Sequence, residues 1–346
     1  MVRNRTISAC MCVLFLLSAN ALGRSSKNEK EIHFDLYHQY LVVLRGSLGK
    51  LGKRNILLDT GTNPITIDQR VAQQLGLKEL PDARREMHAM SGQVEARLVN
   101  LSSLEIGPIH REGIPAAVWD LSMFQRQAGV RIDAVIGLGV FAPESFKIDY
   151  ASRRIVFGPI EAGTPSVPFA SGPPFVTVPM QVRSQPLKVL IDTGAAGLIL
   201  FKNRMGEWQR DLPVVSRRES NNVIGAASLL EVKVDGMQMG KENFEAGSAF
   251  LVESHCCNFD GLFGVSGDRV KEIGFDFDRG LFSWRLQDGP LFPAAESQSP
   301  DCIFQPSSAE VAPPRGEEFG PLPKEFGPLP GETTCEPKPR PLGHAR

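Results

Sequence analysis

The tripeptide Asp-Thr-Gly occurs twice in the chain, at residues 59–61 and 192–194, each time directly after an apolar run. Two carboxylates held close together can act as a base and an acid, because the second does not ionise easily beside the first. Attack of water on an amide needs both groups, one to take a proton from water and one to protonate the amide oxygen. Asp59 and Asp192 are therefore the candidate catalytic residues, on the condition that the fold brings them together.

The other residues of both turns suit this chemistry. Gly61 and Gly194 have no Cβ, so backbone N–H groups can approach the carboxylates closely. The hydroxyls of Thr60 and Thr193 could form hydrogen bonds between the two copies and hold them in a fixed relative position. These four residues, together with Thr62, are the candidate supporting residues of the site.

The two copies differ in the residue that follows the glycine. Thr62 could donate a hydrogen bond to Asp59 and favour its ionised form, whereas the side chain of Ala195 has no donor. We therefore expect Asp59 to be the ionised base and Asp192 the protonated acid. The missing donor should also raise the upper pKa of the pair and move the pH optimum toward neutral.

The repeat extends well beyond the turns and keeps the same order in both halves. The matched blocks are 55–67 with 188–200, 104–121 with 232–252, 132–141 with 259–268, and 146–158 with 273–285. A repeat of this length predicts duplicated lobes rather than a solenoid. Each lobe would then supply one carboxylate, which explains why the chain has two turns.

Most of these blocks have the composition of β-strands. They are short, rich in Val, Ile, Leu and Phe, and bounded by Gly, Pro, Asn or Asp. Asp68 could cap a short helix at 69–75 that Gly76 ends. We predict a mostly β fold of two homologous, closed-barrel-like lobes with a shared central cleft.

Composition divides the chain into four predicted parts. They are a signal peptide at 1–23, an N-terminal lobe at 24–160, a C-terminal lobe at 161–290 and a Pro-rich tail at 291–346. Several prolines mark residues 159–174 as the linker between the lobes.

The first part has the features of a secretory signal peptide. Arg3 and Arg5 precede an apolar stretch at 7–17 that is short for a membrane span, and small residues follow at Ala21 and Gly23. We predict a secreted or periplasmic protein, with no stable membrane insertion after signal cleavage. An uncleaved N-terminal anchor is the alternative.

The last part is rich in Pro, Gly, Ser and Glu, and the hexapeptide EFGPLP occurs in it at 318–323 and 325–330. Such a composition buries too little apolar surface to offset the entropy of ordering, so we expect a disordered tail. A ligand for a partner protein or for the cell wall is the alternative interpretation.

Signal cleavage would leave four cysteines, at positions 256, 257, 302 and 335. In an oxidising compartment they could form two disulfides, with three possible pairings, and neighbours such as Cys256 and Cys257 rarely bridge each other. A metal site at 255–257 lacks the usual ligand spacing. We expect neither a metal nor another cofactor.

Taken together, these features resemble the aspartic peptidases, a group that includes pepsin and the retroviral proteases, and are most similar to bacterial secreted retropepsin-like proteins. Each half has the turn, an apolar-apolar-Gly motif (135–137 and 262–264) and a strand of the FKIDY type (146–150 and 274–278). The resemblance covers roughly residues 32–286. It implies an endopeptidase that hydrolyses peptide bonds through a water activated by the two aspartates. In this family the carboxylates share one proton, and the acid and base roles are taken from that established behaviour.

The resemblance also implies flaps, which are glycine-tipped hairpins that close over a substrate. The candidate flap residues are Met90, Ser91, Gly92, Ile224 and Gly225. Gly92 and Gly225 are separated by the same number of residues as Asp59 and Asp192. Pepsin-like enzymes carry a tyrosine on the first flap, and neither of the two candidate flap segments, 87–97 and 219–231, contains one. This favours closure by a pair of flaps, as in the retroviral proteases.

Three functions fit the sequence. The leading one is an aspartic endopeptidase, the second is a secreted binding protein that keeps the acid-protease fold with weak or no catalysis, and the third is a cell-envelope scaffold that works through the tail. A formal net charge of −1 gives no basic face for nucleic acid. We expect a monomer with an intramolecular pseudo-dimer and with peptide or protein substrates, and a partner for the tail is the alternative to a tail without one.

Overall fold

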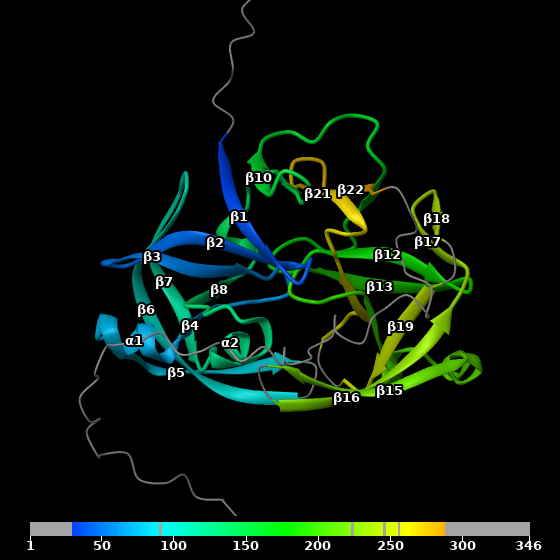
Figure 1. Ribbon diagram of the computed structural model, residues 1–346, viewed down its shortest axis with the longest axis horizontal. Coiled ribbons are helices and arrows are strands. Elements are labelled where there is room, and N and C mark those ends of the chain that lie inside the picture. The colour runs from blue at the N-terminus through cyan, green and yellow to red at the C-terminus, as the bar shows by residue number, and fades with distance from the viewer. Residues whose placement is uncertain (1–29, 90–91, 223–224, 245–246, 255–256, 288–346) are drawn as a thin grey trace, which may run out of the picture. The chain divides into compact units, whose positions relative to one another are not determined.

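The computed structural model describes residues 30–287 except 90–91, 223–224, 245–246 and 255–256. The described part is mostly β and contains two large sheets, which confirms the predicted fold class (Figure 1). Closure of the sheets into barrels remains a prediction, as do the boundaries of the four sequence parts. Within the described ranges, no helix is long and apolar enough to cross a membrane.

The first sheet contains the strands of the N-terminal half and three later strands. Its order is β11 (Ser166–Pro168), β22 (Leu281–Leu286), β21 (Val270–Asp276), β9 (Phe146–Asp149), β10 (Arg154–Phe157), β1 (Glu31–Tyr37), β2 (Leu41–Leu48), β3 (Leu51–Leu58), β8 (Ala134–Ile136), β4 (Ile65–Asp68), β7 (Ile109–Trp119), β6 (Gly92–Ile106) and β5 (Glu79–Ala89).

The second sheet belongs to the C-terminal half. Its order is β15 (Val214–Asn222), β16 (Gly225–Val234), β19 (Gly247–Val252), β14 (Leu198–Phe201), β20 (Gly261–Gly264), β13 (Gln185–Asp192), β12 (Thr177–Val182), β17 (Met237–Met239) and β18 (Glu242–Phe244). Short helices connect the strands: α1 (Gln69–Leu75), α2 (Ser122–Ala128) and the 3-10 turns η1 (Leu138–Val140), η2 (Lys202–Arg204) and η3 (Glu207–Asp211).

Strands from the two halves meet in the first sheet. β9 pairs antiparallel with β21, with Phe146 opposite Phe275 and Ile148 opposite Ile273. From this junction the order continues through β10 to β1 on one side and through β22 to β11 on the other. The stretch 159–174, expected as a linker, therefore also supplies a strand. Backbone hydrogen bonds as well as side chains join the two halves.

The predicted helix at 69–75 is present as α1, and its ends follow the sequence signals. The carboxylate of Asp68 accepts the N–H of Arg70, and Gly76 ends the helix with a φ of 63°. A side-chain acceptor before the helix and a left-handed glycine after it are the expected cap residues.

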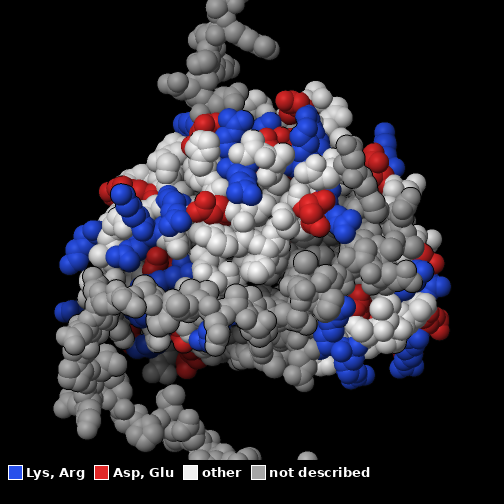
Figure 2. All heavy atoms as spheres, in the orientation of Figure 1, with Lys and Arg blue, Asp and Glu red and all other residues white. Residues whose placement is uncertain are grey.

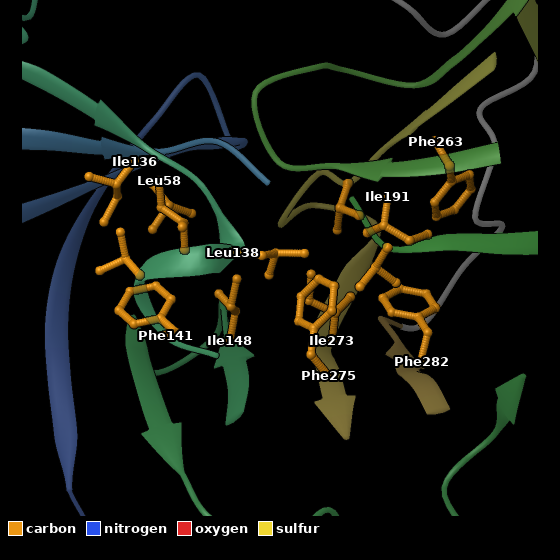
Figure 3. Close-up of a cluster of buried hydrophobic side chains, with 14 of the residues drawn as sticks. Leu58, Ile136, Leu138, Phe141, Ile148, Ile191, Phe263, Ile273, Phe275 and Phe282 are labelled. Atoms are coloured by element: carbon orange, nitrogen blue, oxygen red, sulfur yellow. The ribbon is translucent and has the colours of Figure 1, made fainter. Parts of the chain in front are cut away.

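One apolar core extends across both halves beneath the Asp-Thr-Gly turns. Figure 3 shows Leu138 and Ile148 of the first half beside Ile273 and Phe275 of the second. Leu58 and Ile191, which directly precede the two catalytic candidates, are fully buried in the same cluster, as the figure also shows. The strands that end at the two turns are therefore anchored in a common core.

Charges of both signs are mixed over the surface. Figure 2 shows Lys and Arg interspersed with Asp and Glu on the face in view. Exposed ion pairs such as Lys30 with Glu144 and Arg45 with Asp35 join some of them. Pairs of this kind add little to stability, so the buried core and the strand pairing carry the fold.

Candidate active site

Each Asp-Thr-Gly turn begins where a buried parallel strand pair ends. In the first half β3 runs parallel to β8, with Leu58 opposite Ile136, and the N–H of Asp59 donates to the Ile136 carbonyl at 2.9 Å. In the second half β13 runs parallel to β20, with Asp192 opposite Gly264. β8 and β20 also pair antiparallel with β4 and β14, the strands that follow the turns. The same arrangement of three strands thus holds both turns.

The glycine of each apolar-apolar-Gly motif packs directly against the backbone of a turn. A Cβ added to Gly137 would lie 1.9 Å from the carbonyl oxygen of Thr62, and one added to Gly264 would lie 2.4 Å from that of Ala195. Real Cβ atoms do not approach backbone oxygen this closely. Only glycine fits at these two positions without moving the turn.

Thr60 and Thr193 hold the two turns together through four buried hydrogen bonds. The Thr60 hydroxyl donates to the Ile191 carbonyl at 2.6 Å and accepts the N–H of Thr193 at 3.0 Å. The Thr193 hydroxyl donates to the Leu58 carbonyl at 2.9 Å and accepts the N–H of Thr60 at 3.1 Å. Both threonines are fully buried. The pattern is reciprocal, so the position of each turn depends on the other.

The two carboxyl groups are brought into contact with each other. The charge of Asp59 acts directly on Asp192, and each Oδ1 accepts the N–H of the glycine in its own turn, Gly61 for Asp59 and Gly194 for Asp192, at 2.8 Å. A Cβ added to Gly61 would lie 2.9 Å from Asp192 Cγ, and one added to Gly194 would lie 2.6 Å from Asp59 Cγ. Both glycines are thus needed so that each carboxyl group can lie against the opposite turn.

The surroundings of the two aspartates differ in the predicted direction. Burial raises the pKa of Asp59, and this rise is partly offset by the Thr62 hydroxyl, which donates to Oδ2 at 2.8 Å. Burial, followed by the negative charge of Asp59, holds the pKa of Asp192 well above its ordinary value. The side chain of Ala195 supplies no matching hydroxyl. These directions favour Asp192 as the carboxyl group that stays protonated to the higher pH.

Two of the candidate flap residues, Gly92 and Gly225, begin the second strands of two antiparallel strand pairs. β5 pairs with β6 and β15 pairs with β16, with Ala89 opposite Gly92 and Asn222 opposite Gly225. Met90, Ser91 and Ile224 lie outside the described residues. The hairpins are present where the resemblance implied them, and their role as flaps remains a prediction.

Sequence reasoning did not single out Asp133 and Asp260, which each hydrogen-bond the strand that leads to a turn. A signal was available, because in both halves an aspartate stands four residues before the motif glycine. Cys257 is disulfide-bonded, and the other cysteines all lie outside the described residues, so the pairing stays open.

Residues 45–140 match the family model of the aspartyl proteases. This part of the chain is similar to the aspartyl proteases. The match supports the predicted retropepsin-like family, and no curated protein matches the chain significantly. The matched residues include Asp59, the first hairpin and Gly137. Asp192 lies beyond them, and its place beside Asp59 follows from the hydrogen bonds between the two turns.

Proposed function

We propose that this chain is an aspartic endopeptidase that hydrolyses peptide bonds through one water molecule activated by Asp59 and Asp192. The observation that carries the proposal is the contact between the two carboxyl groups, which are supplied by turns that interlock through Thr60 and Thr193. The family match supports protease activity, and the geometry of the pair supports the particular chemistry.

In the first step the ionised Asp59 takes a proton from the water, and the water oxygen bonds to the amide carbon. Asp192 gives its proton to the amide oxygen at the same time, so a neutral gem-diol forms, no charge develops on the substrate oxygens, and the single negative charge of the pair passes from Asp59 to Asp192. In the second step Asp59 returns its proton to the nitrogen, and the carbon–nitrogen bond breaks. One diol hydroxyl then gives its proton to Asp192, which restores the starting state.

The other residues of the site hold Asp59 and Asp192 in a fixed relative position. A bound water can bridge two carboxyl groups only if their separation does not drift, and misplacement by about 1 Å can cost on the order of 10²-fold in rate. The threonine interlock and the two motif glycines fix the turns on buried strands. The two hairpins would lie over an extended peptide as a pair of flaps. We also propose that the protein acts outside the cytoplasm, as the signal-like first residues indicate.

The test is cleavage of a diverse peptide library by the purified protein from about pH 3 to about pH 8, with and without pepstatin. Asp59→Asn and Asp192→Asn should each abolish cleavage, because either change removes one of the two proton-transfer groups. The matched control is Asp149→Asn. Asp149 is also repeated between the halves, and its carboxylate accepts the N–H of Ser152 in a neighbouring turn, which asparagine can also do.

Cleavage that survives either substitution in the pair would refute the shared mechanism. If the wild-type protein cleaved no peptide at any pH, the second interpretation would replace the first, namely a binding protein that keeps the fold. Loss of cleavage in the Asp149→Asn control would show that the assay reports folding rather than chemistry.

A further inference from the structure

Asp133 and Asp260 occupy equivalent places, one residue before β8 and one residue before β20. The carboxylate of Asp133 accepts the N–H of Asn55 at 3.0 Å, and its own N–H donates to the Asn55 carbonyl at 2.9 Å. Asp260 makes the same two bonds with Lys188, at 2.8 and 2.7 Å. Asn55 and Lys188 each stand four residues before a catalytic candidate. Each aspartate therefore clamps the strand that leads to a turn.

Each clamp also holds a third strand. The carbonyl of Asp133 accepts the N–H of Asp68, the last residue of β4, and the carbonyl of Asp260 accepts the N–H of Phe201, the last residue of β14. Both bonds are 2.9 Å long. A single aspartate in each half thus joins the strand before the turn, the strand after the turn and the strand that passes between them.

The bonds between Asp133 and Asn55 lie directly before the first residue pair of the parallel strands β3 and β8, Ile56 opposite Ala134. A slip of one residue would turn every side chain of β8 to the opposite face of the sheet. It would also move Gly137 away from the Thr62 carbonyl and put a residue with a side chain in its place, where no Cβ fits. The bonds between Asp133 and Asn55 therefore decide how the turn at Asp59 is supported.

The two halves provide the same cation to these carboxylates from different places in the chain. Arg131 Nε lies 3.4 Å from Asp133 Oδ1, and Arg204 Nε lies 3.4 Å from Asp260 Oδ1. Arg131 precedes its aspartate by two residues, whereas Arg204 belongs to η2 and is distant in sequence. If the arginines were only a remnant of the sequence repeat, both would stand at the same position relative to their aspartates. The shared feature is instead the chemistry, an aspartate side chain with an arginine beside it before each apolar-apolar-Gly motif.

We propose that Asp133 and Asp260 are positioning residues, each of which fixes the strand register behind one catalytic aspartate and thereby the separation of the two carboxyl groups. The catalytic consequence rests on the proposed function, but the geometric consequence does not. The two clamps are unequal, because Asp133 is buried whereas the side chain of Asp260 is 23% exposed. Removal of the Asp133 carboxylate should therefore have the larger effect.

The test compares Asp133→Ala and Asp260→Ala with Asp133→Asn and Asp260→Asn in the full chain. Asparagine keeps an oxygen that can accept the clamped N–H, and alanine does not. Titration of the Asp59 and Asp192 carboxyl carbons by NMR reports their separation without any need for cleavage. We expect the alanine variants to shift this coupled titration and to lower kcat on the order of 10²-fold, with KM changed by less than about threefold. The asparagine variants should keep the wild-type titration and a kcat within about tenfold of wild type.

Asp149→Ala is the control, because it removes a repeated aspartate whose bond to Ser152 is confined to a local turn. It should leave the titration unmoved. Folded alanine variants with wild-type titration and kcat would overturn the proposal, and so would asparagine variants as defective as the alanine ones. If an alanine variant does not fold, Asp133→Ser or Asp260→Ser takes its place, because the serine side chain is shorter than that of aspartate and still polar.

The two proposals fail in different ways. Wild-type protein without cleavage, but with a titration that shifts in the alanine variants, would refute the proposed function and leave the positioning role standing. Wild-type cleavage combined with an unmoved titration in the variants would refute the positioning role alone.

Discussion

Replacement of Thr60 by valine would break half of the interlock between the two turns. Valine has nearly the shape of threonine, so the change removes the hydroxyl and leaves little cavity. The N–H of Thr193 and the carbonyl of Ile191 would lose their partner, and both residues are fully buried. Each buried backbone group left unsatisfied costs about 1–3 kcal/mol, so the expected loss is about 2–6 kcal/mol. Small domains have only about 5–15 kcal/mol of stability in total, so this is a large fraction.

The assay is urea unfolding of the wild-type and Thr60→Val proteins, followed by tryptophan fluorescence. Thr193→Val should cost a similar amount, because it strands the N–H of Thr60 and the carbonyl of Leu58 in the same way. Thr66→Val is the control: Thr66 is also a buried threonine, on β4, but it takes no part in the interlock, so we expect a loss below about 1 kcal/mol. A loss for Thr60→Val as small as that of the control, with an unchanged denaturant slope, would refute the reasoning.

Three further predictions concern the pair and its supporting glycine. Ala195→Ser adds a donor beside Asp192, which should lower the upper pKa of the pair and move the optimum of kcat/KM to more acidic pH; an unmoved profile would contradict this. The raised pKa of Asp192 means that its contribution to stability is present below the ordinary aspartate pKa and is lost as the pH rises through the raised value. In Asp192→Asn, the free energy of unfolding in urea should therefore fall less as the pH rises than it does in the wild-type protein. An identical pH dependence in both proteins would argue against burial of Asp192 as the cause. Gly137→Ala should lower the stability measured by thermal unfolding by more than about 3 kcal/mol, because its Cβ would lie 1.9 Å from the Thr62 carbonyl oxygen. Gly139→Ala is the control, since a Cβ there meets open space and should change the stability little. Equal effects of the two substitutions would show that the turn can move.

Local signals in the sequence determined the features that depend on a few neighbouring residues. The strand composition gave the mostly β class, and Asp68 and Gly76 marked the ends of α1 through bonds within one helical turn. α2 could not be located in the same way, since its N-cap residue, Leu121, forms no side-chain cap hydrogen bond. The repeated Asp-Thr-Gly turns, in register with later glycines, were sufficient to name Asp59 and Asp192 as candidates.

Contacts between residues that are distant in the sequence became visible only in the folded structure. The interlock of Thr60 with Thr193 joins residues 133 positions apart, and no local preference specifies such a bond. The same holds for β11, which the prolines of 159–174 marked only as a connection, and for the clamps at Asp133 and Asp260. The hydrogen-bond partners in these features depend on which buried strands pack side by side, because buried backbone N–H and carbonyl groups are almost always hydrogen-bonded to the groups that packing brings near them. The sequence thus determined which residues could do the chemistry, and packing across the two halves decided that they meet.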